Sequence, residues 1–291
     1  MTHYNLIVIG FGKAGKTLAK YASSQGQQVA LIEQFTESYG GTCINHGCIP
    51  SKVLVNDGIK HVDFSTAFSR KKEVVKALKN EGDLTTVETS QGNFTGDAIL
   101  LATGRVPNTD LALDNTDIEL GTHGEIKVNN HLQTSVSHIY AAGDVKGGLQ
   151  FTYISLDDFR ILKSELFGDR SRHTENRGTI PYTVFIDPPL SRVGMTALEA
   201  QKLNYNYVEN TLFINTLPKH KINNDGRGLF KVVINKDNNE ILGATLYGKG
   251  SEEIINLIKL AIDQHIPYQV LRDNIYTHPT IAESFNDLFN I

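Results

Sequence analysis

The sequence of 291 residues predicts an α/β protein, in which a domain of alternating strands and helices is followed by a smaller α+β domain. One observation is the short apolar run at 6–9, which leads through a glycine-rich turn into a helical pattern. Another is the polar linker at 168–178, after which short strands and helices follow in an α+β pattern. The chain is long enough for two compact units, and we expect them at 1–170 and 178–291.

The glycine-rich turn predicts a Rossmann-like, dinucleotide-binding unit. Gly10 allows the tight turn, Gly12 lets a pyrophosphate approach the backbone, and Gly15 lets the helix pack closely on the strand. A second strand at 28–32 ends in Glu33, 23 residues after Gly10, where a carboxylate can accept hydrogen bonds from a ribose. A glycine-rich turn of the same fold without a ligand remains the alternative.

Composition limits the classes of partner. The chain is 40% hydrophobic and 21% charged, and its net charge is -4. A chain with no basic excess is not expected to bind nucleic acid or anionic membranes broadly. The first 22 residues have neither a signal-peptide pattern nor a membrane span, so we expect a cytoplasmic protein.

The chain has only two cysteines, Cys43 and Cys48, in the stretch GGTCINHGCIPSK at 40–52. In a regular helix their Cα atoms would lie roughly 8 to 9 Å apart, beyond the limit of about 7 Å for a disulfide. Gly47 and Pro50 permit the necessary distortion of the backbone. In the cytoplasm such a pair is expected to be catalytic or redox-sensing, although a buried structural disulfide or two inert thiols would also fit.

This motif, with the glycine turn before it, resembles the class I pyridine nucleotide-disulfide oxidoreductases, the flavoprotein family of glutathione reductase, dihydrolipoamide dehydrogenase and mercuric reductase. The resemblance implies FAD as the dinucleotide. It makes Cys43 the thiol that attacks substrate, Cys48 the thiol against the flavin, and Lys52 the cation that stabilises reduced flavin and lowers a thiol pKa. A surface lysine is the alternative for Lys52. The FAD-binding residues that it implies are Gly10, Gly12, Gly15, Glu33, Gly41, Thr42, Lys52, Gly143 and Asp144.

His46 lies between the two cysteines and suggests a zinc site made by Cys43, His46 and Cys48. The spacing lacks the paired CxxC or HxxxH geometry of zinc sites, and the sequence offers no fourth ligand. We therefore expect no metal and a histidine that faces solvent.

A second resemblance to FAD binding is the run IYAAGD at 139–144. It is similar to the family's second FAD motif, in which Asp144 would bind the ribitol chain of the flavin. An aspartate that caps the next turn is the alternative. The segment 149–153 would then pass by the flavin ring and open a helix that ends near Phe167.

One domain of the family is missing from the sequence. The run ILLATGRVPN at 99–108 resembles the segment where the family's chain returns from its nicotinamide-cofactor domain. Only about 20 residues separate it from the end of a predicted helix at 69–80, too few for a domain. We expect the NAD(P)H domain to be absent or reduced to a hairpin near 80–98.

The run HPTIAE at 278–283 resembles the catalytic base pair of the family. Glu283 would orient the imidazole of His278, which would move a proton to and from Cys43. The resemblance implies that the α+β domain at 178–291 is the dimerisation domain of a homodimer, in which this pair serves the cysteines of the other subunit. An unexceptional loop histidine is the alternative.

Together these motifs predict an FAD-dependent disulfide oxidoreductase with a role in cell redox homeostasis. Electrons would pass from NAD(P)H through FAD to the cysteine pair, and then to an oxidised small-molecule substrate. The segments TCINHGCIPSK and FTYISLDDFR, the second at 151–160, most resemble those of the bacterial hypothiocyanite and reactive-chlorine stress reductases. The alternative is a catalytically impaired FAD-binding homodimer without its NAD(P)H site.

Overall fold

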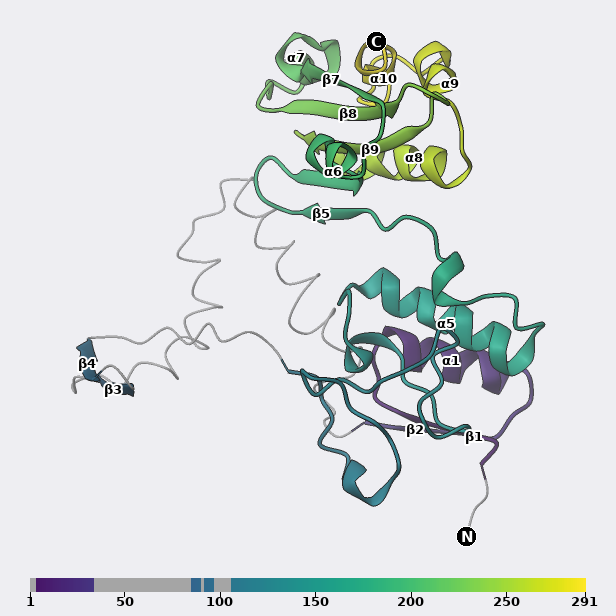
Figure 1. Cartoon of the computed structure of the whole chain (residues 1–291). Helices are drawn as coiled ribbons and strands as arrows, with labels where there is room; N and C mark the ends of the chain where they lie inside the picture. The colour runs from purple at the N-terminus through teal and green to yellow at the C-terminus, as the bar shows by residue number, and fades with distance from the viewer. Residues whose placement is uncertain (1–3, 34–84, 90–91, 97–105) are drawn as a thin grey trace. The chain divides into compact units, whose positions relative to one another are not determined.

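The computed structural model describes residues 4–33, 85–89, 92–96 and 106–291 (Figure 1). The chain divides into two compact units, residues 1–176 and 177–291, and each is described here by itself. The predicted helix at 69–80 and the cysteine motif at 40–52 lie outside the described residues.

The first unit begins with the predicted strand, turn and helix. Strand β1 (Leu6–Ile9) pairs in parallel with β2 (Val29–Ile32), and α1 (Lys13–Ser24) makes the crossover that a parallel pair requires. Helix α1 buries small and apolar side chains at helical spacing and packs on α5 (Thr152–Phe167). Their shared core is formed by Leu18, Leu132, Ile161 and Leu162. The predicted α/β fold class is confirmed in this unit.

The rest of the first unit has little regular structure among its described residues. Strands β3 (Thr85–Thr89) and β4 (Gly92–Gly96) form an antiparallel hairpin. The strand predicted within 139–144 is wrong: only an isolated bridge joins Tyr140 to Gln133, and a 3-10 helix, η3 (Gly143–Lys146), follows. The backbone here forms hydrogen bonds with the irregular loop at 132–136, and this loop is too short to form a strand that could pair with it. Two further 3-10 turns are η2 (Leu113–Asn115) and η4 (Thr174–Asn176).

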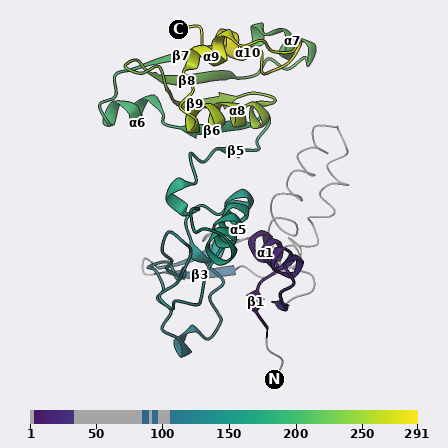
Figure 2. The same ribbon diagram turned by 90° about the vertical axis from the view of Figure 1, so that its right-hand side faces the viewer.

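The second unit is an α+β domain built on a five-stranded antiparallel sheet with the order β5-β6-β9-β8-β7 (Figures 1 and 2). Its strands are β5 (Tyr182–Val184), β6 (Leu190–Gly194), β7 (Tyr207–Phe213), β8 (Leu229–Asn235) and β9 (Ile241–Tyr247). The sequence did not predict β6, although β6 joins β5 to the middle of the sheet.

Helices cover this sheet. They are α6 (Ala197–Lys202), α7 (Pro218–Ile222), α8 (Ser251–Asp263), α9 (Tyr268–Asp273) and α10 (Ser284–Leu288), with a 3-10 turn, η5 (Ile214–Thr216), before α7. Helix α8 packs on β6 and β9, and α10 packs on β7 and β8. Apolar residues of both helices share one core with the sheet, for example Ile258, Phe285 and Phe230. This core fixes the segment between α9 and α10, where the HPTIAE motif lies.

His220 on α7 is fully buried and meets the ring of Phe230 edge to face. Burial lowers its pKa, and the Lys249 backbone and the charge of Asp225 oppose this only in part. The folded protein therefore holds fewer protons at this site than the unfolded chain does. As the pH falls below the unfolded pKa of about 6.5, we expect the free energy of unfolding to decrease by up to about 1.4 kcal/mol per pH unit from this group.

This expectation can be checked by urea unfolding at pH 7, 6 and 5. In His220→Leu the stability should depend less steeply on pH than in the wild type, because the titrating group is gone. His138→Gln, which changes an exposed histidine, is the control and should keep the wild-type slope. A His220→Leu protein with the wild-type slope would show that His220 does not contribute.

Candidate functional site

The glycine turn between β1 and α1 is held by contacts that only glycine permits at two of its positions. Gly10 has φ +100°, in the left-handed region, and its N–H donates to the carbonyl of Ile32 at 2.7 Å. A Cβ on Gly15 would lie 2.5 Å from the carbonyl oxygen of Gly10. The turn is tied to the second strand because the Phe11 N–H donates to Glu33 Oε2 at 2.9 Å. Gly10, Gly15 and Glu33 are thus brought together, as the sequence predicts for a dinucleotide turn.

Gly12 differs from its two neighbours in the motif. It is the N-cap of α1, its φ is an ordinary -68°, and a Cβ placed on it would meet no atom of the described residues within 4 Å. Within the described part of the chain no side chain caps the helix, and its first turn has no acidic residue. The packing of the described residues therefore does not require glycine here, whereas a phosphate group lying against the helix N-terminus would. The residues present fit the pyrophosphate of FAD.

This contrast gives a matched pair of substitutions. We expect Gly12→Val to fold, with a loss of stability of no more than about 1 kcal/mol from the poorer N-cap. It should bind FAD at least about tenfold more weakly, because the new side chain fills the space of the pyrophosphate. Gly15→Val should instead unfold at a lower temperature, because its side chain overlaps the Gly10 backbone. Thermal unfolding without FAD, followed by titration with FAD, separates the two effects. A Gly12→Val protein with unchanged FAD affinity would contradict this assignment.

The second predicted FAD motif forms the compact turn η3. Gly143 has φ +77°, and Asp144 lies in the first turn of η3, half-buried. The Gly143 N–H donates to Asp158 Oδ2 on α5 at 2.8 Å, and Lys146 Nζ lies 3.4 Å from the same oxygen. The turn is therefore fixed to α5 by a buried carboxylate.

The N-terminal end of α5 has an aromatic pair. The rings of Phe151 and Tyr153 are stacked with their centroids 5.0 Å apart. Tyr153 is 42% exposed, and the partial burial of its ring raises the pKa of the phenol, which is neutral at physiological pH. This pair lies in the segment 149–153 that we predict to pass by the flavin ring.

The HPTIAE motif in the second unit forms a histidine and carboxylate pair. His278 Nδ1 lies 2.7 Å from Glu283 Oε2, and the imidazole is 66% exposed while the Glu283 side chain is 20% exposed. When the Nδ1–H group donates a hydrogen bond to the carboxylate, Nε2 carries the free lone pair of a general base. The predicted pair is thus brought together with geometry suited to proton transfer.

Neighbouring residues hold this pair in place. The Thr280 N–H donates to Glu283 Oε1 at 3.1 Å, and the Thr280 hydroxyl donates to the carbonyl of Thr277 at 2.7 Å. The amide of Asn286 on α10 donates to the carbonyls of Arg272 and Asn274, just before the motif. One oxygen of the Glu283 carboxylate therefore accepts a hydrogen bond from a backbone N–H, and the other lies against the imidazole of His278.

Asp158, Lys146 and Thr280 were not predicted from the sequence. Asp158 could have been found, because it stands four residues after Ile154 and three before Ile161, at an apolar position of the α5 pattern. A charge at such a position is expected to have a partner. The remaining predicted site residues lie outside the described residues: Gly41, Thr42, Cys43, Cys48 and Lys52. So does His46, which we expect to face solvent.

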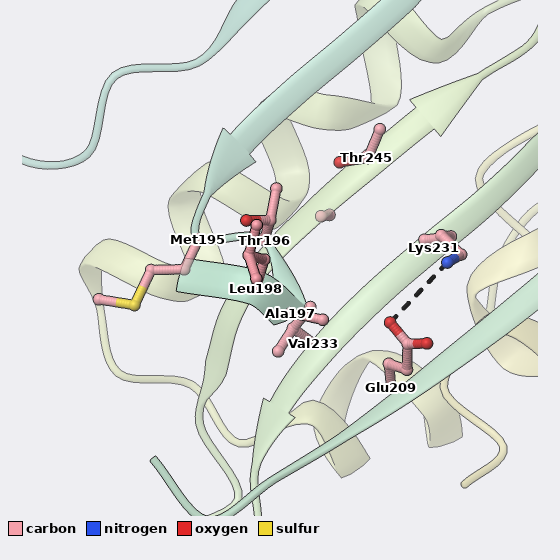
Figure 3. A pocket seen from close by; sticks show the side chains of 9 residues that line it. Met195, Thr196, Ala197, Leu198, Glu209, Lys231, Val233 and Thr245 are labelled. Atoms are coloured by element: carbon pink, nitrogen blue, oxygen red, sulfur yellow. Dashed lines mark ion pairs between the residues drawn. The ribbon is translucent and has the colours of Figure 1, made fainter. Parts of the chain in front are cut away.

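A cavity of about 190 Å³ lies on the sheet of the second unit, beside α6 (Figure 3). The turn at 195–198 lines one side, and the ion pair of Lys231 with Glu209, 3.8 Å apart, lies on another. None of the described residues that line it is predicted to bind FAD or to act on substrate. Among the described residues, no group of three metal-ligating side chains is placed to hold an ion, and no described helix is long and apolar enough to cross a bilayer.

Comparison with known proteins places these features in a family. A family model described as pyridine nucleotide-disulphide oxidoreductase matches residues 4–71 and 66–158, and a model of the dimerisation domain of that family matches residues 180–289. The chain is 29% identical to a dihydrolipoyl dehydrogenase of Buchnera aphidicola, over 96% of this chain and 58% of that enzyme. It therefore spans little more than half of that relative.

A more similar relative is the probable pyridine nucleotide-disulfide oxidoreductase RclA of Escherichia coli, with 32% identity over 100% of both chains. The alignment has 439 positions, 148 more than the chain's 291 residues, so RclA has an internal stretch that this chain lacks. A structure described as the HOCl-induced flavoprotein disulfide reductase RclA has a TM-score of 0.87 to this chain, with 31% identity, covering 98% of this chain and 99% of that one.

The predicted resemblance, including the likeness to reductases of reactive-chlorine stress, is thereby confirmed. The C-terminal α+β domain is the dimerisation domain that the fold prediction named. On the strength of the family models and the full-length relative, the chain belongs to the pyridine nucleotide-disulphide oxidoreductase family.

Proposed function

We propose that this chain is an FAD-dependent disulfide oxidoreductase that reduces an oxidised small-molecule substrate through the pair Cys43 and Cys48. The observation that supports this best is the His278 and Glu283 pair, 2.7 Å apart, in the dimerisation domain of a family of flavoprotein oxidoreductases. A histidine held by a carboxylate is the acid–base group that thiol and disulfide exchange needs.

FAD, when bound, would supply two-electron transfer between a nicotinamide donor and the disulfide. The turn at Gly12 would hold its pyrophosphate, Glu33 its ribose and Asp144 its ribitol chain. Gly41, Thr42 and Lys52 would complete the site, with the Lys52 cation favouring reduced flavin and the Cys48 thiolate.

Reduction of the disulfide takes up two electrons and gives the Cys43 and Cys48 thiols after protonation. For a disulfide substrate, the Cys43 thiolate would attack one sulfur, form a mixed disulfide with it and expel the first product as a thiolate. The Cys48 thiolate would then attack the sulfur of Cys43, so that the mixed disulfide breaks, the second product leaves as a thiolate and the Cys43–Cys48 bridge re-forms. His278 would accept the proton from Cys43 and return it to the leaving thiolate.

We also propose that the active site is shared by the two subunits of a homodimer, with His278 of one subunit serving Cys43 of the other. The match of residues 180–289 to a dimerisation domain supports this assembly. A cytoplasmic location, where thiols are kept reduced, suits a catalytic cysteine pair.

The second candidate function is an FAD-binding homodimer without turnover. The internal stretch of about half the chain's own length that RclA has and this chain lacks favours it, because the NAD(P)H domain would be the part lost. Anaerobic titration with NADH or NADPH separates the two proposals. If the donor still binds, the flavin absorbance near 450 nm should bleach, as is typical of reduced flavins.

Bleaching by dithionite but by neither nicotinamide would contradict NAD(P)H as the donor and would favour the second candidate. E. coli RclA, the relative that this chain matches over its full length, is the positive control under the same conditions.

A further inference from the structure

A buried ion pair in the first unit lies against the second FAD motif and has no role in the chemistry proposed above. The Asp158 side chain is 0% exposed and that of Lys146 is 10% exposed. Charged side chains are rarely buried to this extent, because the loss of hydration is costly unless each charge has a partner. Lys146 is the last residue of the short turn η3, and Asp158 accepts a hydrogen bond from the first residue of the same turn.

Two contacts hold this turn against one face of α5. The Gly143 N–H donates to Asp158 Oδ2 at 2.8 Å, and Lys146 Nζ approaches the same oxygen at 3.4 Å. The backbone of Gly143 also lies close to the helix, because a Cβ on it would be 3.1 Å from Ser155 Oγ, one turn earlier on α5. The first and last residues of η3 are therefore both attached to Asp158.

Asp144 lies between these two attachment points. Since Gly143 on one side and Lys146 on the other are fixed, the backbone of Asp144 has little freedom to move away from α5. An unattached turn with two positive-φ glycines behind it, Gly147 and Gly148, would sample many conformations. The entropy of ordering it would then oppose FAD binding.

We propose that Asp158 and Lys146 are positioning residues that hold the turn at Gly143 and Asp144 in its FAD-binding form before the cofactor arrives. This inference rests on the proposed function in one respect, that the chain binds FAD. Neither residue is assigned contact with FAD. They act through the turn between them.

The test compares FAD binding by full-length variants after removal of bound FAD. In Lys146→Met with Asp158→Leu, apolar groups of similar size replace the buried pair, a change that often leaves stability unaltered. The Gly143 N–H then has no acceptor on α5. We expect the Kd for FAD to rise roughly 10- to 100-fold, the effect of losing one hydrogen bond to a charged group. Thermal unfolding without FAD establishes that the protein is folded.

Asp157→Asn is the matched control. Asp157 is the adjacent residue on α5, is buried to a similar extent, and pairs with Arg172 at 2.6 Å and Arg160 at 3.6 Å. This variant should lose stability and yet bind FAD within twofold of the wild type. Equal FAD affinity in the double variant and the wild type would overturn the inference.

If the double variant does not fold, Asp158→Asn is the deciding variant, because it keeps the shape of the side chain and removes the negative charge opposite Lys146. A Kd for FAD at least tenfold above that of Asp157→Asn supports the inference, whereas equal values overturn it. A wild-type protein that takes up no FAD would overturn the proposed function itself, and this inference with it.

Discussion

Replacement of Cys43 by serine is expected to abolish turnover, with a loss of more than about 1,000-fold in kcat/KM for a disulfide substrate. A serine hydroxyl is not ionised near neutral pH and cannot form the bridge to Cys48. The FAD content should remain that of the wild type, because Cys43 is assigned to the substrate side. Cys48 is no longer held in a disulfide in this variant, so the oxidised protein should show the long-wavelength absorbance of a thiolate against the flavin. The measurement is steady-state reduction of a disulfide such as 5,5'-dithiobis(2-nitrobenzoate), with absorbance spectra of the same preparations.

Retention of activity in Cys43→Ser would remove this residue from its assigned role. Loss of FAD together with activity would mean that the substitution disturbs the cofactor site. Cys48→Ser is the matched control: it should lose turnover equally, and it should also lose the long-wavelength absorbance that a thiolate against a flavin produces.

The second large loss of activity is expected on replacement of His278, the proposed general base. His278→Gln should lower kcat/KM by about 100- to 10,000-fold, because it removes the group that accepts and returns the proton of Cys43. Stability should change little, since the imidazole is 66% exposed. Turnover and thermal unfolding of the same samples check both statements.

The chain offers a matched control for this substitution. His265 in the same unit also pairs with a carboxylate, Glu240, at 3.0 Å, and is more exposed than His278. His265→Gln should keep activity within twofold of the wild type. Equal losses in the two variants would mean that a surface histidine and glutamate pair matters for folding and not for proton transfer.

The two variants also test the shared site. If His278 serves the cysteines of the other subunit, subunits with Cys43→Ser and subunits with His278→Gln are each inactive alone. Random reassociation in equal amounts gives about half mixed dimers with one complete site each, so about one quarter of wild-type activity should return. No return of activity would favour a site built within one subunit.

Local patterns in the sequence predicted the parts of the fold that depend on near neighbours. The β1, α1 and β2 order follows from apolar runs and three glycines, and α5 and α8 follow from helical spacing. Strand β6 was not predicted, because Pro188 and Pro189 precede it and Gly194 ends it, and these residues are typical of a break between elements. Its strand conformation depends on pairing with two other strands. β5 lies just before the turn that leads into β6, whereas β9 is about 50 residues further along the chain.

The candidate site divides in the same way. Gly10, Gly12, Gly15 and the HPTIAE motif could be found because their residues lie close together in the chain. Asp158 stands 15 residues from the glycine that it holds, and only the packing of η3 on α5 reveals the contact. His220 lies in a segment with two lysines, PKHKI, which reads as exposed although the histidine faces the core.

The central claim, that a flavin lies against a reducible pair of sulfurs, is tested most directly by anaerobic dithionite titration of the FAD-loaded protein. We predict that each FAD site takes up two electrons in the sulfur pair and two more in the flavin, with a long-wavelength band at the halfway point. Uptake of only two electrons per FAD, with direct bleaching and no such band, would contradict the account.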